Sequence, residues 1–461
     1  MLTLWGEKRK PFREGLSRRH FLRIGSLGFG GLSLPQLLRA ESSMSRRDDE
    51  RAVVMIYLPG GPTQHETFDP KPNAPREVRG PCDAIGTRIP GTQFCEFLPK
   101  LSNMADRFSI VRTLVGMENR HESFQCFTGR PAGRNGDNEP AGGWPTLGSI
   151  VSSVKGHAAD GMVSYVDAGP KMSYRPYNNH GEHNPSGTTS WPGFTGQQHT
   201  PFALEGEVKD DLVLKGVDPS RLNDRRALLT ALGHMRDHGM TDGLDSYQQQ
   251  AFGVLTSNRL VDAMDLQQED PKVLQRYGNA QATDASFGGA PQSPQHLLLA
   301  RRLIEVGVRC VTVAFGAWDW HGNREGSIDH LSKKYLPVFD HAIATFLGDL
   351  DERGMLDKVS VVVWGEFGRT PRVNAKGGRD HWPGTQSVLL AGGGMRGGRI
   401  IGETDHNGAI PVSRAVHVQE VFATLYRNLG IDANRVAIPD LNGRPRYLVD
   451  ENRQPISELY S

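Results

Sequence analysis

Residues 358–371 read KVSVVVWGEFGRTP, an apolar, β-branched run that gives way to glycine and charged residues. An unbroken run of this kind is typical of a strand buried on both faces of a parallel sheet, and it predicts a strand at 358–364. The polar loop that follows then stands at the carboxyl end of the strand, where ligands bind in open α/β sheets. This stretch therefore indicates both the class of the fold and a place for its chemistry.

Strands and helices alternate along much of the remaining chain. A strand is predicted at 51–58, just before Pro59-Gly60-Gly61, and another at 107–114. Apolar patterns further along predict helices at 293–306, 336–353 and 416–429, and strands at 309–315 and 387–391. This alternation predicts an α/β fold with a mostly parallel sheet covered by helices on both faces.

The middle of the chain reads differently. Residues from about 130 to 290 are rich in Gly, Pro, Asn and His, with only patchy helices at 221–239 and 244–266. The chain is longer than one typical domain, yet large α/β domains with insertions reach such a length. We therefore expect a single α/β domain over 52–461, in which 130–290 forms an irregular insertion or cap.

The amino-terminal residues carry the pattern of a twin-arginine export signal. SRRHFL at 17–22 precedes a weakly apolar, glycine-containing stretch at 24–38. That stretch is too short for a bilayer-spanning helix, which needs roughly twenty residues, so we expect no stable membrane anchor. The pattern predicts a signal peptide at 1–40, a linker at 41–51, and export by the twin-arginine translocase to the periplasm or the cell exterior.

Charge and cysteine content narrow the class of protein. Residues 1–40 hold eight Lys or Arg and two Asp or Glu, so their removal shifts the formal charge from +1 to −5. A mildly acidic chain gives no electrostatic reason to expect nucleic acid as a partner. None of the four cysteines forms a CxxC pair, which argues against a thiolate zinc site. An oxidising compartment permits a Cys82–Cys95 bridge around a short loop, and for Cys126 and Cys310 free buried thiols are equally compatible with the sequence.

Carboxylates and imidazoles follow three of the predicted strands and recur in one nearby loop. The segments are GGPTQHETFD at 60–69, WDWHGN at 318–323, GEFGRTP at 365–371 and GRDHWP at 378–383. Taken singly, such residues are often loop caps or ion pairs, as Glu366 with Arg369 would be. Together they favour a site for divalent metal ions such as Zn²⁺, Mn²⁺ or Ca²⁺. Two ions about 4 Å apart would clamp a tetrahedral phosphate or sulfate group.

GEFGRTP at 365–371 with GRDHWP at 378–383 closely resembles family 1501 of the domains of unknown function (DUF1501). FDPKP at 68–72 and WDWHGN at 318–323 carry the same resemblance, which covers nearly the whole chain after the leader. That family is similar to the alkaline-phosphatase-like superfamily, which contains sulfatases and phosphopentomutases. The resemblance implies an alkaline-phosphatase-like core.

The resemblance also implies metal ligands. Asp319, His321 and His381 match one metal site, and Glu366 matches the carboxylate of a second site. Glu66 stands where the family usually has the second acid, an Asp, and Asp69 competes for that role. Phe367 stands where related enzymes commonly place a metal-binding His, so the second site is depleted.

The nucleophile is the least defined part of the resemblance. Thr128-Gly129-Arg130 is similar to a sulfatase motif whose formylglycine precursor lies nine residues before the Thr, but Asn119 is at that position. Cys126 lies too late in the chain to replace it, which disfavours formylglycine chemistry. His121 would either bind metal or act as the nucleophile. Asn119 and Ser123 read as helix caps.

These features support three hypotheses. The first is an exported metal-dependent hydrolase of phosphate or sulfate esters, acting on a small-molecule or glycan ester. In it, His121 or an activated water attacks, and Arg369 stabilises the developing negative charge. The second is a non-catalytic protein of the same fold that binds metal and an anionic glycan. The third is a structural envelope protein whose metal only stabilises the fold.

Overall fold

The computed structural model describes residues 50–131, 140–156, 162–169, 192–204, 258–278 and 289–461. From Arg51 on, they belong to one compact unit, Arg51–Ser461. The predicted signal peptide, nearly all of the linker, the helix predicted at 221–239 and most of the one at 244–266 lie outside the described residues. None of the described helices is both long and apolar enough to cross a membrane.

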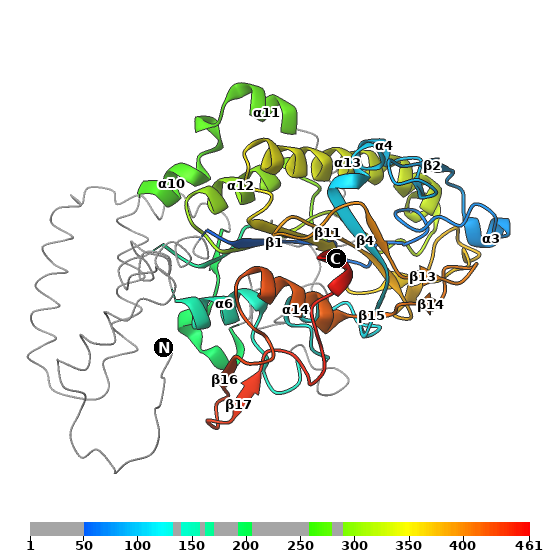
Figure 1. Cartoon of the computed structure of the whole chain (residues 1–461). Coiled ribbons are helices and arrows are strands. Elements are labelled where there is room, and N and C mark those ends of the chain that lie inside the picture. The colour runs from blue at the N-terminus through cyan, green and yellow to red at the C-terminus, as the bar shows by residue number, and fades with distance from the viewer. Residues whose placement is uncertain (1–49, 132–139, 157–161, 170–191, 205–257, 279–288) are drawn as a thin grey trace, which may run out of the picture. The chain divides into compact units, whose positions relative to one another are not determined.

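A nine-stranded sheet forms the centre of this unit (Figure 1). The strands lie in the order β12 (Arg399–Ile401), β4 (Phe108–Val115), β11 (Gln386–Ala391), β8 (Val359–Trp364), β1 (Ala52–Tyr57), β7 (Cys310–Ala314), β5 (Tyr165–Asp167) and β6 (Phe202–Ala203), with β15 (Val416–His417) also paired to β4. All pairs are parallel except those of β11, which runs antiparallel to β4 and β8. The prediction of a mostly parallel α/β sheet is confirmed.

Helices cover both faces of the sheet (Figure 1). Successive side chains of a strand point to opposite faces, and β1 shows the division. Val54 and Ile56 pack into one core, and Val53 and Met55 into the other. The first core is covered by α4 (Pro99–Asn103), α10 (Asn258–Met264), α11 (Pro271–Tyr277), α12 (Pro294–Glu305) and α13 (Ile328–Glu352), and the second by α5 (Phe124–Thr128), α6 (Leu147–Lys155) and α14 (Val418–Asn428). Burial on both faces explains why the central strands are apolar without alternation.

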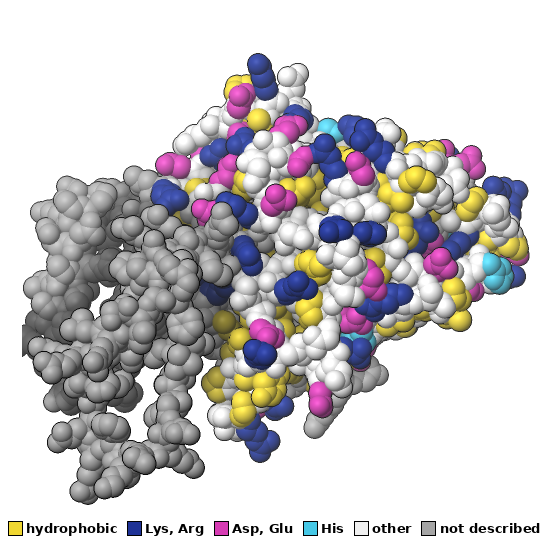
Figure 2. Space-filling model, in the orientation of Figure 1, with side chains coloured by type: hydrophobic (Ala, Val, Ile, Leu, Met, Phe, Trp, Pro, Cys, Tyr) yellow, Lys and Arg dark blue, Asp and Glu magenta, His cyan; other side chains and the backbone are white. Residues whose placement is uncertain are grey.

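Smaller elements extend from this framework. They are α3 (Arg76–Arg79) and the antiparallel pairs β2 (Ala84–Gly86) with β3 (Gln93–Cys95), β9 (Gly368–Arg369) with β10 (His381–Trp382), β13 (Glu403–Thr404) with β14 (Pro411–Ser413), and β16 (Ala437–Pro439) with β17 (Pro445–Tyr447). On the face seen in Figure 2, basic and acidic side chains are interspersed.

Two predicted segments differ in detail from the structure. The helix predicted at 336–353 begins at Ile328, where the Ser327 hydroxyl accepts a hydrogen bond from the His330 backbone N–H, and it contains Pro337. Proline is most common in the first turn of a helix, which makes Pro337 a misleading start signal. Within the segment expected to be an insertion, β5 and β6 extend the main sheet beyond β7.

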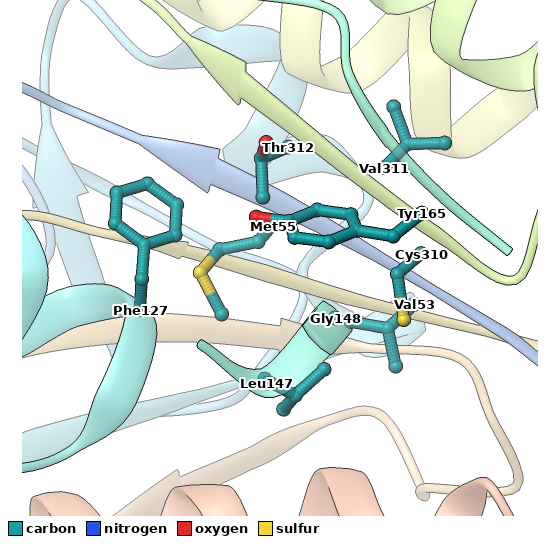
Figure 3. Close-up of a pocket in the computed structure, with 9 residues that line it drawn as sticks. All are labelled: Val53, Met55, Phe127, Leu147, Gly148, Tyr165, Cys310, Val311 and Thr312. Atoms are coloured by element: carbon teal, nitrogen blue, oxygen red, sulfur yellow. The ribbon is translucent and has the colours of Figure 1, made fainter. Parts of the chain in front are cut away.

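The core contains a small cavity between the sheet and α6 (Figure 3). It is lined by Val53, Met55, Phe127, Leu147, Gly148, Tyr165, Cys310, Val311 and Thr312. The lining has no charged side chain, so it offers no chemistry for an anion or a metal. The four cysteines are free and buried in the structure, including Cys82 and Cys95. A hydrogen bond from Cys82 and burial raise the pKa of the Cys95 thiol.

Candidate metal centre

The loops that carry the predicted site residues meet at the carboxyl edge of the sheet. Tyr57 at the end of β1 stands opposite both Ala314 of β7 and Trp364 of β8, so these three strands end level with one another. The loops that follow them therefore begin side by side. They contribute Asp319 and His321 after β7 and Glu366 after β8, and the loop after β4 contributes His121.

His381 reaches the same edge by a different route. Because β11 runs antiparallel to its neighbours, its amino end lies where the others have their carboxyl ends. His381 belongs to β10, just before β11, and stands opposite Arg369 in the β9–β10 pair. The antiparallel direction of β11 thus places His381 at the edge where the parallel strands end.

Four side chains form a group with the geometry of a metal site. His121, Asp319, His321 and His381 each offer one donor atom, and these atoms all lie within 4.8 Å of one another. The Nε2 atoms of His321 and His381 are 2.9 Å apart and lie 2.9 and 3.3 Å from Asp319 Oδ1. His121 Nε2 lies 3.5 Å from Asp319 Oδ2. Three imidazoles and one carboxylate suit Zn²⁺ or Mn²⁺ better than Ca²⁺, which prefers oxygen ligands.

The second ring nitrogen of each imidazole is also held. In each ring, Nδ1 lies within hydrogen-bond distance of a side-chain oxygen. The pairs are His121 with Glu366 (3.0 Å), His321 with Asp380 (2.9 Å) and His381 with Asn119 (2.8 Å). Metal-binding histidines almost always donate their other N–H in this way, because it fixes the tautomer and the orientation of the ring. The surroundings of the group therefore fit a metal ion as well as its donor atoms do.

Glu366 gives a further sign that the centre suits a cation. Its side chain is wholly buried, and Oε1 accepts a hydrogen bond of 2.8 Å from the Gly60 backbone N–H. The other oxygen, Oε2, has no hydrogen-bond partner among the described residues. A buried carboxylate oxygen without a partner is costly, and a cation bound next to His121 would offset that cost.

The protonation states of two donors, Asp319 and His381, suit metal binding. Burial alone would raise the pKa of Asp319, but hydrogen bonds from His321 and His381 and the charge of Arg369 outweigh it and hold the pKa well below its usual range. Asp319 is thus ionised at neutral pH. Burial lowers the pKa of His381, so its ring is neutral and its Nε2 can bind a metal.

Arg369 lies behind Asp319 rather than open to a substrate. The side chain is wholly buried, and Nη2 donates to Asp319 Oδ1 at 2.5 Å and to the Gly60 carbonyl. Nε donates to the Gly61 carbonyl at 2.9 Å, and Nη1 to the Arg379 carbonyl at 3.0 Å. These contacts orient Asp319 and tie the loop after β1 to the centre.

The structure does not bring Glu66 into the group of donors. Glu66 is wholly buried and pairs with Arg379, with Nη2 2.7 Å from Oε1 and Nε 2.9 Å from Oε2, and Oε2 also accepts from Thr63. The competing acid, Asp69, contacts Lys71 at 3.0 Å and accepts from Thr404 at 2.5 Å. Both acids are thus committed to contacts within the protein.

Two further residues shape the centre. The ring of Phe367 lies 4.4 Å from that of His381 and 5.2 Å from that of His121, so an apolar side chain packs against two of the imidazoles. Sequence reasoning missed Asn119 as a site residue and read it as a helix cap. The only signal was its place nine residues before Thr128.

Asn119 should tune the affinity for metal without being a ligand. We expect Asn119→Ala to weaken Zn²⁺ binding by about 10- to 100-fold, as the loss of such an outer partner typically does. Asn119→Asp keeps an acceptor for His381 Nδ1 and should retain the affinity. Isothermal titration of the metal-free variants with Zn²⁺ measures both, and equal affinities for Asn119→Ala and the native protein would contradict this role.

Gly60 should be irreplaceable because of the close approach of Asp319. Its φ is +106°, and a Cβ there would lie 2.4 Å from the Asp319 backbone nitrogen. Gly60→Ala must therefore displace the loop that carries Asp319, and we expect Zn²⁺ affinity to fall by at least about tenfold. Gly91→Ala is the matched control, since Gly91 has a φ of +76° but open space around its Cβ position. It should lose about 1 kcal/mol of stability through backbone strain and no metal affinity.

A family model described as "Protein of unknown function (DUF1501)" matches residues 50–460. No curated protein matches the sequence. Solved structures with a similar fold include a sulfatase from a Pseudoalteromonas species (12% identity, TM-score 0.38, covering 86% of this chain and 70% of that one). A lipoteichoic acid synthase from Listeria monocytogenes has 10% identity and a TM-score of 0.37, covering 83% and 72%. A phosphonate monoester hydrolase of Agrobacterium radiobacter has 13% identity and a TM-score of 0.33, covering 89% and 77%. Likenesses this distant bear on neither the activity nor the site residues.

Proposed function

We propose that this chain, which belongs to the DUF1501 family of proteins of unknown function, is an exported hydrolase that uses a divalent metal ion to cleave phosphate or sulfate esters. One observation carries the proposal. Three imidazoles and Asp319 converge within 4.8 Å, and each imidazole has its second nitrogen held by Glu366, Asp380 or Asn119. A site prepared to this degree has the donors and the outer contacts that a catalytic metal needs.

A divalent ion, when bound, would polarise an ester oxygen and make water a stronger nucleophile near neutral pH. The chain's own residues hold the centre in the form that this chemistry requires. Arg369 and two imidazoles keep Asp319 ionised, and Glu366 orients His121 through Nδ1. His121 is therefore a metal ligand in this proposal, and Arg369 positions Asp319.

Water is the nucleophile in this proposal. Ser123 and Cys126, a hydroxyl and a thiol in the loop and helix after β4, are both wholly buried. Asn119 has no nucleophilic atom, and its carbonyl oxygen is engaged with His381. The ligand side chains keep some contact with solvent, from 17% exposed for His121 to 41% for His321. Water and a substrate can thus reach the centre.

Export is part of the proposal and rests on SRRHFL at 17–22. A leader of this type suits a protein that folds and takes up its metal before it crosses the membrane. Replacing Arg18 and Arg19 by lysine should keep the protein in the cytoplasm, as cell fractionation would show. Export of that variant at the native level would contradict this assignment.

The activity is tested with aryl sulfates, aryl phosphate monoesters and aryl phosphodiesters. We expect turnover of at least one class, its loss after chelation, and its return when Zn²⁺ or Mn²⁺ is added back. Circular dichroism after chelation would check that the fold survives. A metal-loaded protein that hydrolyses none of these esters would contradict the proposal.

A second candidate is a protein that binds metal and an anionic glycan without turnover. Two residues favour this candidate. Asn119 stands at the position where the resemblance implies a nucleophile, and Phe367 packs on two of the imidazoles. This candidate predicts metal-dependent binding of sulfated glycans with no release of sulfate. Metal-dependent turnover of a sulfated glycan would exclude it.

A further inference from the structure

We infer that the centre holds one divalent ion, and that the guanidinium of Arg369 takes the place beside Asp319 that a second ion would need. The inference rests on the proposed function only in requiring that a metal ion binds the four donors. It replaces the two-ion arrangement expected from the sequence with one bound metal ion and one fixed positive charge.

The described residues offer no second set of metal donors. The only group of three or more His, Cys, Asp or Glu donors among them is the one around Asp319. The acids of the loop after β1 are engaged elsewhere. Arg379 makes charged contacts with both oxygens of Glu66, and Lys71 and Thr404 contact Asp69. Glu366 keeps one oxygen without a hydrogen-bond partner among the described residues, but a single carboxylate is too few ligands for a second ion.

The guanidinium of Arg369 already occupies the oxygens that a second cation could use. It contacts Asp319 Oδ1 and the backbone carbonyls of Gly60, Gly61 and Arg379. Carboxylate and carbonyl oxygens are the ligands of hard cations such as Ca²⁺. An arginine does not lose its proton in proteins, so it places a permanent positive charge among these four oxygens.

The loop after β1 is shaped for this contact. Gly60 and Gly61 both have positive φ values, +106° and +75°, and both carbonyls accept from Arg369. A Cβ on Gly61 would lie 2.6 Å from the ring of Phe367, so only glycine fits at this position of the loop. The backbone conformation of these two glycines thus directs both carbonyls at Arg369. We infer that the position of the guanidinium is a built-in feature of the centre.

Metal content is the first test. The full-length protein, purified after loading with excess Zn²⁺ and desalting, should contain one equivalent of Zn²⁺ per chain by plasma mass spectrometry. Two equivalents would overturn this inference and leave the proposed function standing. No bound metal would overturn both, so the two failures are distinguishable.

The second test removes the guanidinium. Arg369→Ala exposes its four oxygens, so millimolar Ca²⁺ should raise the melting temperature of this variant by at least about 2 °C. The native protein should not respond, and neither should Arg309→Ala, which removes another buried arginine that lies just before β7 and donates to the Gly156 carbonyl. A folded Arg369→Ala without a Ca²⁺ response would overturn the inference. If that variant does not fold, the Zn²⁺ content of Arg369→Lys is measured instead. Because lysine keeps the positive charge, the inference requires one Zn²⁺ per chain in this variant, and two would overturn it.

Discussion

His381→Ala is expected to lose both the bound metal and the ester hydrolysis that depends on it. The change removes a donor whose Nε2 lies 2.9 Å from that of His321 and 3.3 Å from Asp319 Oδ1. Loss of an outer partner of a ligand typically costs about 10- to 100-fold in affinity or activity, and loss of a ligand itself should exceed that range. Plasma mass spectrometry of the purified variant and kcat/KM on the best aryl ester measure the two effects.

The matched control for this variant is His330→Ala. His330 is exposed on α13 and belongs to no group of metal donors. Its replacement should leave metal content and kcat/KM at the native level. If His381→Ala kept its metal and its turnover, the four-donor centre would be wrong. If it kept the metal but lost turnover, His381 would act on the substrate rather than on the ion.

Glu66→Gln should have the second large effect, on stability rather than on metal binding. Glu66 and Arg379 are both wholly buried and linked by contacts of 2.7 and 2.9 Å. Breaking a buried ion pair from one side leaves an uncompensated charge and typically costs about 3–5 kcal/mol. We therefore expect the free energy of unfolding in urea to fall by roughly that amount, while the metal content stays native.

The control for Glu66→Gln is an exposed acid. Glu77 pairs with Arg372 at 3.4 Å, and 47% of its side chain is exposed. Glu77→Gln should change the free energy of unfolding by less than about 1 kcal/mol, because surface ion pairs contribute little. A Glu66→Gln variant with native stability and no bound metal would contradict this account. It would show that Glu66 is a metal ligand, as the sequence predicts.

The sheet could be predicted from the sequence because burial on both faces leaves a plain signature. The apolar runs at 51–58 and 358–364 match β1 and β8 to within a residue at each end. The direction of β11 could not be predicted in the same way, since a buried strand has the same composition whichever way it runs. That direction matters, because it brings His381 to the site.

The residues of the candidate site could be predicted wherever their position depends on a strand end. Asp319, His321 and Glu366 follow β7 and β8 directly, so their convergence follows from a parallel sheet. The role of Glu66 depends instead on Arg379, more than 300 residues away in the chain, and no local pattern reveals such a pair. The contact of Asn119 with His381 likewise joins two loops that only the folded sheet brings together.

The central claim is that one metal ion lies between three histidines and Asp319. Anomalous scattering from crystals of the zinc-loaded protein, recorded at the Zn absorption edge, tests it most directly. The structure predicts one peak per chain, about 2.0–2.2 Å from Nε2 of His121, His321 and His381 and from an oxygen of Asp319. A zinc-loaded crystal with no peak among these four side chains, or with its peak beside Glu66, would contradict the claim.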